Sequence, residues 1–168
     1  MIRDGNYERA ATALDEVDPT HESIDAARYF TLNGLVQLGQ GEYGTAADAF
    51  ELAQSAGATD SVIDVYLAQA YYASQQYEDA IDAINRVPNL NQYADLYSVL
   101  AESYWRTGNR VDAYDALSRA IERFPSRTQF LRQRVLYLVE LNLTQEAAEQ
   151  GMVYVESMEN DPEAYVTV

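Results

Sequence analysis

The side chains that most enzyme chemistry relies on are scarce in this chain. It has no cysteine and a single histidine, His21, and all 11 of its basic residues are arginine. The chain therefore lacks the residues for nucleophilic thiols, disulfides and thiolate metal sites, and it has only one histidine with which a catalytic group could pair. A lone histidine just before a helix start is typical of an exposed residue rather than a ligand. The sequence predicts no enzyme activity and no catalytic, cofactor-binding or metal site.

Carboxylates are the remaining candidates for acid–base chemistry. That chemistry needs two carboxyl groups in a dry cleft with different environments, whereas pairs such as Glu78 and Asp79 fall on the outer face of predicted helices. Four acids recur at intervals of 34, 33 and 34 residues: Asp48, Asp82, Asp115 and Glu149. We interpret this acidic ridge mainly as a hydrated, solubilising surface; the alternative is a docking strip for a basic partner.

The overall charge limits the partners. Acids outnumber basic residues 27 to 11, giving a net charge of −16, so the basic stripe that phosphate contacts require is missing and nucleic acid is excluded as a partner. The longest apolar runs, such as residues 35–38 and 135–139, are too short for membrane insertion, and no signal peptide is recognisable. We expect a soluble protein. The compartment stays open between the cytoplasm, including that of a salt-adapted organism, and a bacterial periplasm or envelope after removal of a signal.

A repeat of about 34 residues organises the chain. Five alanines follow the predicted turns at intervals of 36, 34, 33 and 34 residues: Ala10, Ala46, Ala80, Ala113 and Ala147. Upstream of the turns, apolar and small residues recur at i, i+3, i+4 and i+7, as in Tyr97, Leu100, Ala101 and Tyr104. Each period therefore predicts two antiparallel helices, which small residues allow to approach closely. Because one pair cannot bury both of its apolar faces, the pairs must stack into a solenoid.

This pattern closely resembles the tetratricopeptide repeat family, whose consensus period is 34 residues. The third full repeat matches the family motif best, with Tyr97, Leu100, Ala101, Tyr104, Gly108, Ala113, Leu117, Ala120 and Pro125. The fourth departs from it at Val135, Gly151 and Tyr154. The resemblance implies an all-α, right-handed superhelical solenoid of antiparallel helix pairs.

We divide the chain into a single array on this basis. Residues 1–19 hold the second helix of a truncated repeat, residues 22–58, 59–90 and 91–125 hold three full repeats, and residues 126–159 hold a degenerate fourth, followed by a tail over 160–168. Because the first helix of the leading repeat is missing, we interpret Met1 as a cloning start, the tail as a linker, and the chain as a fragment of a longer protein.

By resemblance to the family, side chains of the first helix in each repeat line a concave groove. Trp105 and Tyr72 occupy equivalent positions one repeat apart and could form a central hot spot; the alternative is that both are partly buried between first helices. The lysine and asparagine clamp that some members use to grip a C-terminal carboxylate is absent from the matching positions. The partner-binding residues predicted for the groove are Arg28, Thr31, Leu35, Leu38, Val65, Gln69, Tyr72, Asp95, Ser98, Glu102, Trp105, Arg106, Gln129, Arg132 and Leu136.

The groove mixes apolar, aromatic and charged groups. With Glu140 of the same surface included, three acids (Asp95, Glu102 and Glu140) balance the three arginines (Arg28, Arg106 and Arg132). This is the composition of a peptide-binding or helix-binding surface. The sequence therefore predicts a non-catalytic scaffold or adaptor that binds a protein or peptide partner in the groove. The alternative is a structural spacer or self-assembly module, a homo-oligomer whose end helices stack on copies of themselves or on further repeats.

Overall fold

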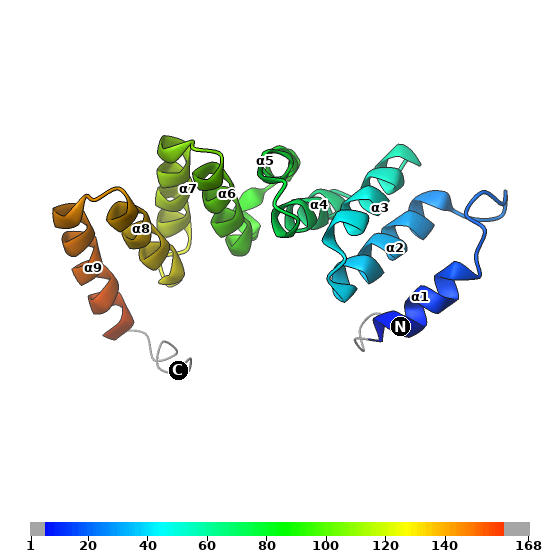
Figure 1. The fold of residues 1–168 in the computed structure, drawn as a ribbon, viewed down its shortest axis with the longest axis horizontal. Helices are drawn as coiled ribbons and strands as arrows, with labels where there is room; N and C mark the ends of the chain where they lie inside the picture. The colour runs from blue at the N-terminus through cyan, green and yellow to red at the C-terminus, as the bar shows by residue number, and fades with distance from the viewer. Residues whose placement is uncertain (1–5, 160–168) are drawn as a thin grey trace. The chain divides into compact units, whose positions relative to one another are not determined.

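The computed structural model describes residues 6–159, and within this range every regular element is helical (Figure 1). The chain divides into two compact units, one up to Leu90 and one from Asn91 on. The division falls where the sequence places the end of the second full repeat. The expectations for Met1 and for the tail over residues 160–168 lie outside the described residues.

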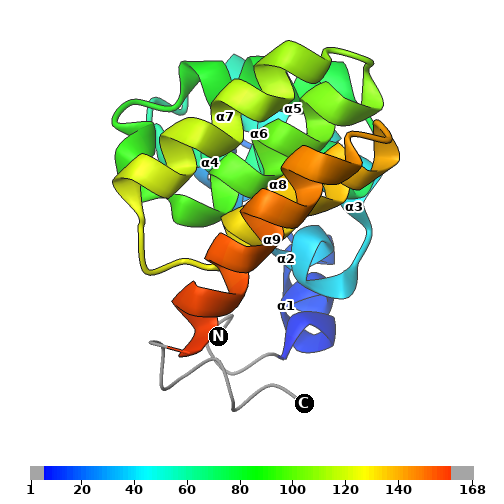
Figure 2. The same ribbon diagram turned by 90° about the vertical axis from the view of Figure 1, so that its left-hand side faces the viewer.

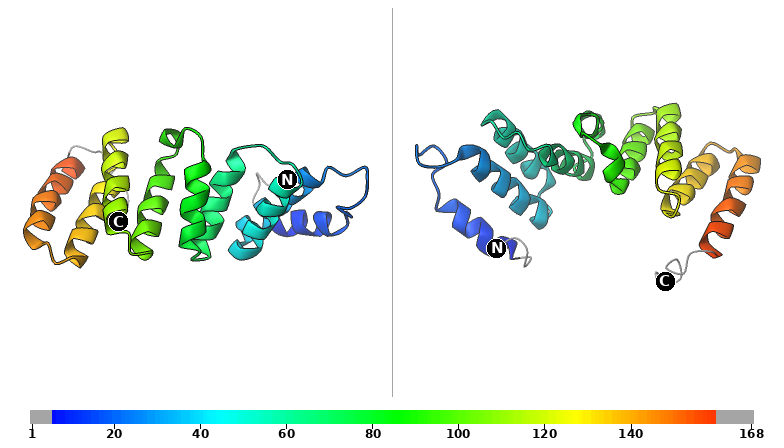
Figure 3. Two further views of the ribbon diagram at one scale, coloured as in Figure 1. Left: turned by 90° about the horizontal axis from the view of Figure 1, so that it is seen from above. Right: turned by 180° about the vertical axis from the view of Figure 1, so that it is seen from behind.

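The first unit is built from two helix pairs and a leading helix. Its helices are α1 (Tyr7–Asp15), α2 (Ala26–Gln40), α3 (Tyr43–Ser55), α4 (Val62–Ala73) and α5 (Tyr77–Arg86). Helix α2 packs against α3, and α4 packs against α5, while α1 covers α2 and α3 joins the two pairs by packing against α4 (Figure 3). Gly34 on α2 lies close to the ring of Phe50 on α3. A Cβ added at Gly34 would lie only 2.6 Å from that ring. Glycine is required at this close approach of two helices.

The second unit repeats the arrangement. A short 3₁₀ turn (η2, Leu90–Gln92) leads into α6 (Ala94–Arg106), α7 (Arg110–Arg123), α8 (Gln129–Glu140) and α9 (Thr144–Glu159). Helix α6 packs against α7 and α8 against α9, and α7 contacts α8, so that α7, α8 and α9 follow one another in Figure 2. Both units are thus stacks of antiparallel helix pairs, as the repeat predicts.

The small residue at the start of each second helix is buried in every copy. The five alanines that defined the period, Ala10, Ala46, Ala80, Ala113 and Ala147, all lie in the core. The large residue four positions later is also buried in the three central copies, as Phe50, Ile84 and Leu117. The fourth repeat has Gly151 at this position. The second helices therefore face their partners in the phase that the sequence predicts.

The turns inside the four helix pairs share one geometry. In each, a single residue adopts a left-handed conformation: Gly41 (φ 84°), Gln75 (φ 65°), Gly108 (φ 85°) and Asn142 (φ 59°). The next backbone N–H then donates to the carbonyl five residues earlier, at 2.8–3.0 Å, as from Glu42 to Gln37 and from Leu143 to Leu138. This is the hydrogen bond of a Schellman motif, which ends the first helix and reverses the chain. The turn thus depends on one backbone conformation and not on the side chains beside it.

The solvent face also follows the sequence prediction. Asp48, Asp82, Asp115 and Glu149 are exposed, each on the second helix of its repeat, and His21 is exposed in the connection before α2. None of the helices within residues 6–159 is long and apolar enough to cross a membrane.

Candidate functional site

The predicted groove residues of the first unit lie on α2 and α4 with different exposures. On α2, Arg28 is exposed, Thr31, Leu35 and Leu38 are half-buried, and the carboxylate of Asp25 accepts a hydrogen bond from the Arg28 N–H at 3.0 Å, which caps the helix. Arg28 and Thr31 line a pocket of about 600 Å³, together with the connection between α3 and α4. These two residues are therefore available to a ligand from solvent.

On α4 the predicted residues are less uniform. Val65 is buried and Gln69 is exposed, while Tyr72 is half-buried with its ring edge-on to Tyr77, 6.0 Å between ring centres. Val65 thus belongs to the core of this unit, whereas Gln69 points to solvent. The structure does not bring a continuous apolar surface together on this helix.

In the second unit, α6 and α8 are joined by hydrogen bonds with one constant offset. Gln133 donates to the carbonyl of Ser98 (3.4 Å), the Tyr137 hydroxyl donates to Glu102 (2.7 Å), and the Trp105 indole N–H donates to Glu140 (2.8 Å).

Each of these bonds joins residues 35 positions apart. Gln133 also donates to the Tyr137 hydroxyl at 2.9 Å. Because the bonds are distributed along both helices, they fix the register of α6 against α8.

Trp105 is the centre of this junction. Its ring stacks on that of Tyr137, with 3.8 Å between the ring centres and the planes only 8° apart. The guanidinium of Arg110, on α7, lies 3.8 Å from the centre of the Trp105 ring. Arg110 also donates to the Trp105 carbonyl. With 6% of its surface exposed, Trp105 is buried between the two first helices, which is the alternative that the sequence left open. It positions its neighbours and presents little surface to a partner.

The remaining predicted residues of this unit form an exposed surface, which we call the α6–α8 face. Asp95 and Arg106 are exposed on α6, with Ser98 and Glu102 half-buried between them, and Arg106 pairs with Glu102 at 2.7 Å. On α8, the spacing of Gln129, Arg132 and Leu136 places all three on one exposed side of the helix. The face is defined by Asp95, Ser98, Glu102, Arg106, Gln129, Arg132 and Leu136.

Leu136 is the apolar centre of the α6–α8 face. It is 52% exposed, and Val139, one turn further along α8, is 55% exposed. The two arginines of the face are balanced by its two acids, Asp95 and Glu102. An apolar patch surrounded by mixed charges and amides can bind a peptide through a buried side chain and hydrogen bonds at its rim.

Possible metal ligands do not gather in the part of the chain that the structure describes. No group of three or more His, Cys, Asp or Glu side chains within residues 6–159 could hold a metal ion. Burial, followed by its hydrogen bond to Glu51, raises the pKa of Tyr71, and hydrogen bonds from Thr20 hold the pKa of Asp18 below its usual value. Neither group lies on the α6–α8 face. The two pKa shifts therefore reflect the local surroundings of Tyr71 and Asp18 and not acid–base chemistry at the candidate site.

The sequence comparison agrees with the repeat geometry. Two sequence models, both described as tetratricopeptide repeat, match residues 37–92 and 99–126, together half of the chain. The chain belongs to the tetratricopeptide repeat family. No curated protein matches it.

Solved structures share the fold of this repeat protein. It is similar to "MamA 41-end from Desulfovibrio magneticus RS-1" with a TM-score of 0.82 and 17% identity, over 96% of this chain and 90% of that one. It is also similar to "Crystal structure of MamA", with a TM-score of 0.74 and 22% identity, over 94% of this chain and 89% of that one. At these identities the comparison shows a common fold.

Sequence reasoning missed several residues of the junction between α6 and α8. Gln133 and Tyr137 lie one helical turn apart on α8, a spacing that places them on the same side of the helix, and this signal was present in the sequence. Their partners on α6, Ser98 and Glu102, were predicted for the groove, but the pairing could not be found from the 34-residue period, because the contacts join residues 35 apart. Arg110 follows the turn and gives no periodic signal.

Proposed function

We propose that this tetratricopeptide repeat chain is a non-catalytic protein–protein interaction scaffold that binds a partner peptide or helix on the first-helix faces of its units. The family and the fold support an interaction scaffold in general. The observation that carries the specific proposal is the α6–α8 face, in which exposed Leu136, beside exposed Val139, lies among polar side chains on a rigid base.

The rigid base matters because binding costs less when the surface is already ordered. The constant register of α6 against α8 holds Glu102 through Tyr137, and Glu102 in turn holds Arg106. Arg132 and Gln129 provide free rim positions on α8. A partner would bury a side chain against Leu136 and make hydrogen bonds to these groups.

Capture of a partner followed by a face-specific variant tests the proposal. A partner captured from the source cell and then purified should bind Leu136→Asp about tenfold or more weakly than the wild-type chain, because a carboxylate replaces the apolar centre. Leu52→Asp is the matched control, since Leu52 is an exposed leucine on α3, a second helix. Equal affinity of the two variants for the partner would exclude the α6–α8 face.

A specific observation favours self-assembly as a second candidate function. On α9, Met152 and Val153 are exposed, whereas Ser118 and Arg119 occupy the equivalent positions on α7. An apolar side of a second helix could pack against another copy. Mass measured by light scattering across a range of concentrations separates the two functions: self-assembly raises the mass, and Met152→Ser with Val153→Arg should then restore the smaller species.

A further inference from the structure

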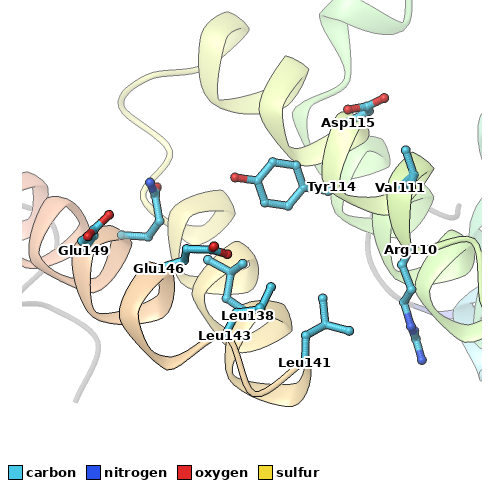
Figure 4. A pocket seen from close by; sticks show the side chains of 10 residues that line it. Arg110, Val111, Tyr114, Asp115, Leu138, Leu141, Leu143, Glu146 and Glu149 are labelled. Carbon is cyan, nitrogen blue, oxygen red and sulfur yellow. The ribbon is translucent and has the colours of Figure 1, made fainter.

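A separate pocket of about 390 Å³ lies in the second unit between α7, the turn from α8 to α9, and the start of α9 (Figure 4). Its apolar wall comes from Val111 and Tyr114 on α7 and from Leu138, Leu141 and Leu143 at the end of α8 and in the turn. Asp115, Glu146 and Glu149 also line it, so an apolar hollow carries carboxylates at its edge. This pocket lies outside the α6–α8 face.

The leucines of the turn are not what this position normally holds in the chain. Leu141 and Leu143 flank Asn142, the left-handed residue of the turn. At the two equivalent positions, the other three turns carry polar residues: Gln40 and Glu42, Ser74 and Gln76, and Thr107 and Asn109. Val111 is likewise aliphatic where the other repeats have Gly44, Glu78 and Gln145. Val111, Leu141 and Leu143 are thus aliphatic at positions where the other repeats are not, and all three line the same pocket.

The geometry of the turn does not require leucine at these positions. The turn needs only the left-handed backbone of Asn142 and the hydrogen bond from the Leu143 N–H to the Leu138 carbonyl, and the polar turns make the same bond. Leu141 is 43% exposed, Leu143 40% and Val111 74%. Clustered aliphatic side chains that remain this exposed are typical of a surface that another molecule covers.

The charge at the edge of the pocket selects the chemistry of that molecule. Within the described chain, no arginine forms an ion pair with Asp115, Glu146 or Glu149. Arg110 also lines the pocket, but its guanidinium is held over the Trp105 ring and bonded to the Trp105 carbonyl. Glu149 accepts a hydrogen bond from Gln145 at 3.1 Å, and none of the three carboxylates has a cationic partner among the described residues, so each can pair with a cation brought by a partner.

We propose that this pocket docks a peptide segment of a partner protein in which an aliphatic side chain stands next to arginine or lysine. The aliphatic group packs against Leu141, Leu143 and Val111, and basic side chains of the segment pair with the carboxylates that line the pocket, Asp115, Glu146 and Glu149. The proposal gives part of the acidic ridge a binding role. It is independent of the α6–α8 face, which has balanced charge.

Fluorescence anisotropy with designed peptides tests this proposal directly. The probe is a short fluorescein-labelled peptide with a Leu-Leu pair followed by two arginines in a Gly/Ser background, and matched peptides carry Glu in place of Arg or Ser in place of Leu. We expect the Leu/Arg peptide to bind about tenfold or more tightly than either matched peptide, with affinity falling as salt is added. Absence of binding at about 1 mM, or equal binding of the Arg and Glu peptides, would overturn the proposal.

Variants of the chain place the binding in the pocket. The double variant Leu141→Thr with Leu143→Asn introduces the residues of the third turn, so the turn still forms, and it should lose about tenfold or more in affinity for the Leu/Arg peptide. Glu146→Gln with Glu149→Gln, which alters only exposed side chains, should weaken binding and flatten its salt dependence even if the first variant folds poorly. Leu136→Asp should leave peptide affinity unchanged, which separates this pocket from the α6–α8 face.

The same variants also expose the competing occupant. Unchanged peptide affinity in both double variants would show that the peptide binds elsewhere and would overturn the proposal. Concentration-dependent mass that Leu141→Thr with Leu143→Asn abolishes would show that a second copy of the chain fills the pocket, and this too would overturn it.

Discussion

Trp105 shows how the same residue can be interpreted in two ways from its sequence position. As an aromatic residue on a first helix it is a typical hot-spot candidate, and its indole would then be exposed to a partner. In the structure its ring is stacked on Tyr137, its N–H bonds Glu140, and Arg110 covers it. Its contribution is to hold α6 against α8, so its removal should be felt first in stability.

Trp105→Ala should destabilise the second unit by about 3 kcal/mol, because it removes a large buried side chain and leaves a cavity between α6 and α8. Tyr137→Phe, which keeps the ring stack and removes the hydroxyl bonded to Glu102, should cost only about 1 kcal/mol. Urea denaturation followed by circular dichroism measures both. A Trp105→Ala loss below that of Tyr137→Phe would contradict the framework role and restore Trp105 as a surface residue.

At the scale of helices, the alanines at the start of each second helix define the spacing within a pair. Ala80 and Ala113 are completely buried, so their neighbours leave no room for a longer side chain. Ala80→Leu and Ala113→Leu should each cost about 1–3 kcal/mol through overpacking. Thermal melts of the two variants provide the measurement, with exposed Ala148→Leu on α9 as the control. If neither buried change lowers the melting temperature, these alanines do not lie between the helices.

Gly151 gives the opposite case in the degenerate repeat. It occupies the position of Leu117, Ile84 and Phe50, yet apart from its chain neighbours and the backbone of its own helix no described atom lies within 4 Å of where its Cβ would be. Gly151→Ala should stabilise α9 by about 1 kcal/mol through helix propensity, and Gly151→Leu should add to this by packing towards α8. Urea titrations rank the two variants. A Leu variant less stable than the Ala variant would mean that this side of α9 does not face its partner helix.

The period in the sequence was enough to predict the helices, because buried alanines and left-handed turns recur at fixed positions and each has one physical cause. It could not predict contacts between neighbouring first helices. Those depend on the register of α6 against α8, which joins Glu102 to Tyr137 and Trp105 to Glu140 rather than residues one period apart. The period also did not predict the pocket beside Leu141 and Leu143, because those leucines depart from the repeat pattern on which the prediction was based.

Across the whole molecule, charge is the dominant feature that the fold does not neutralise. The net charge is −16, and the ion pairs among the described residues, Arg86–Asp64, Arg106–Glu102 and Arg127–Asp95, all involve arginines that are at least half exposed. Pairs of this kind contribute little to stability. The acidic ridge of Asp48, Asp82, Asp115 and Glu149 adds like charges on successive second helices. Repulsion among carboxylates should therefore outweigh attraction from the ion pairs.

Salt should consequently stabilise this protein. The Debye length falls from about 30 Å at 0.01 M to about 3 Å at 1 M ionic strength, so added salt screens the repulsion between exposed acids in the folded chain. We expect the melting temperature to rise between these conditions, and a fall would show that surface ion pairs hold the fold.

The salt dependence of binding should differ between the two proposed sites. Partner affinity at the α6–α8 face should change little with salt, because the charges of that face are balanced. The basic peptide at the acidic pocket should lose affinity over the same range. If the affinity of the natural partner instead falls steeply with salt, then the partner docks mainly at the acidic pocket of the second unit, and the α6–α8 face contributes less to binding.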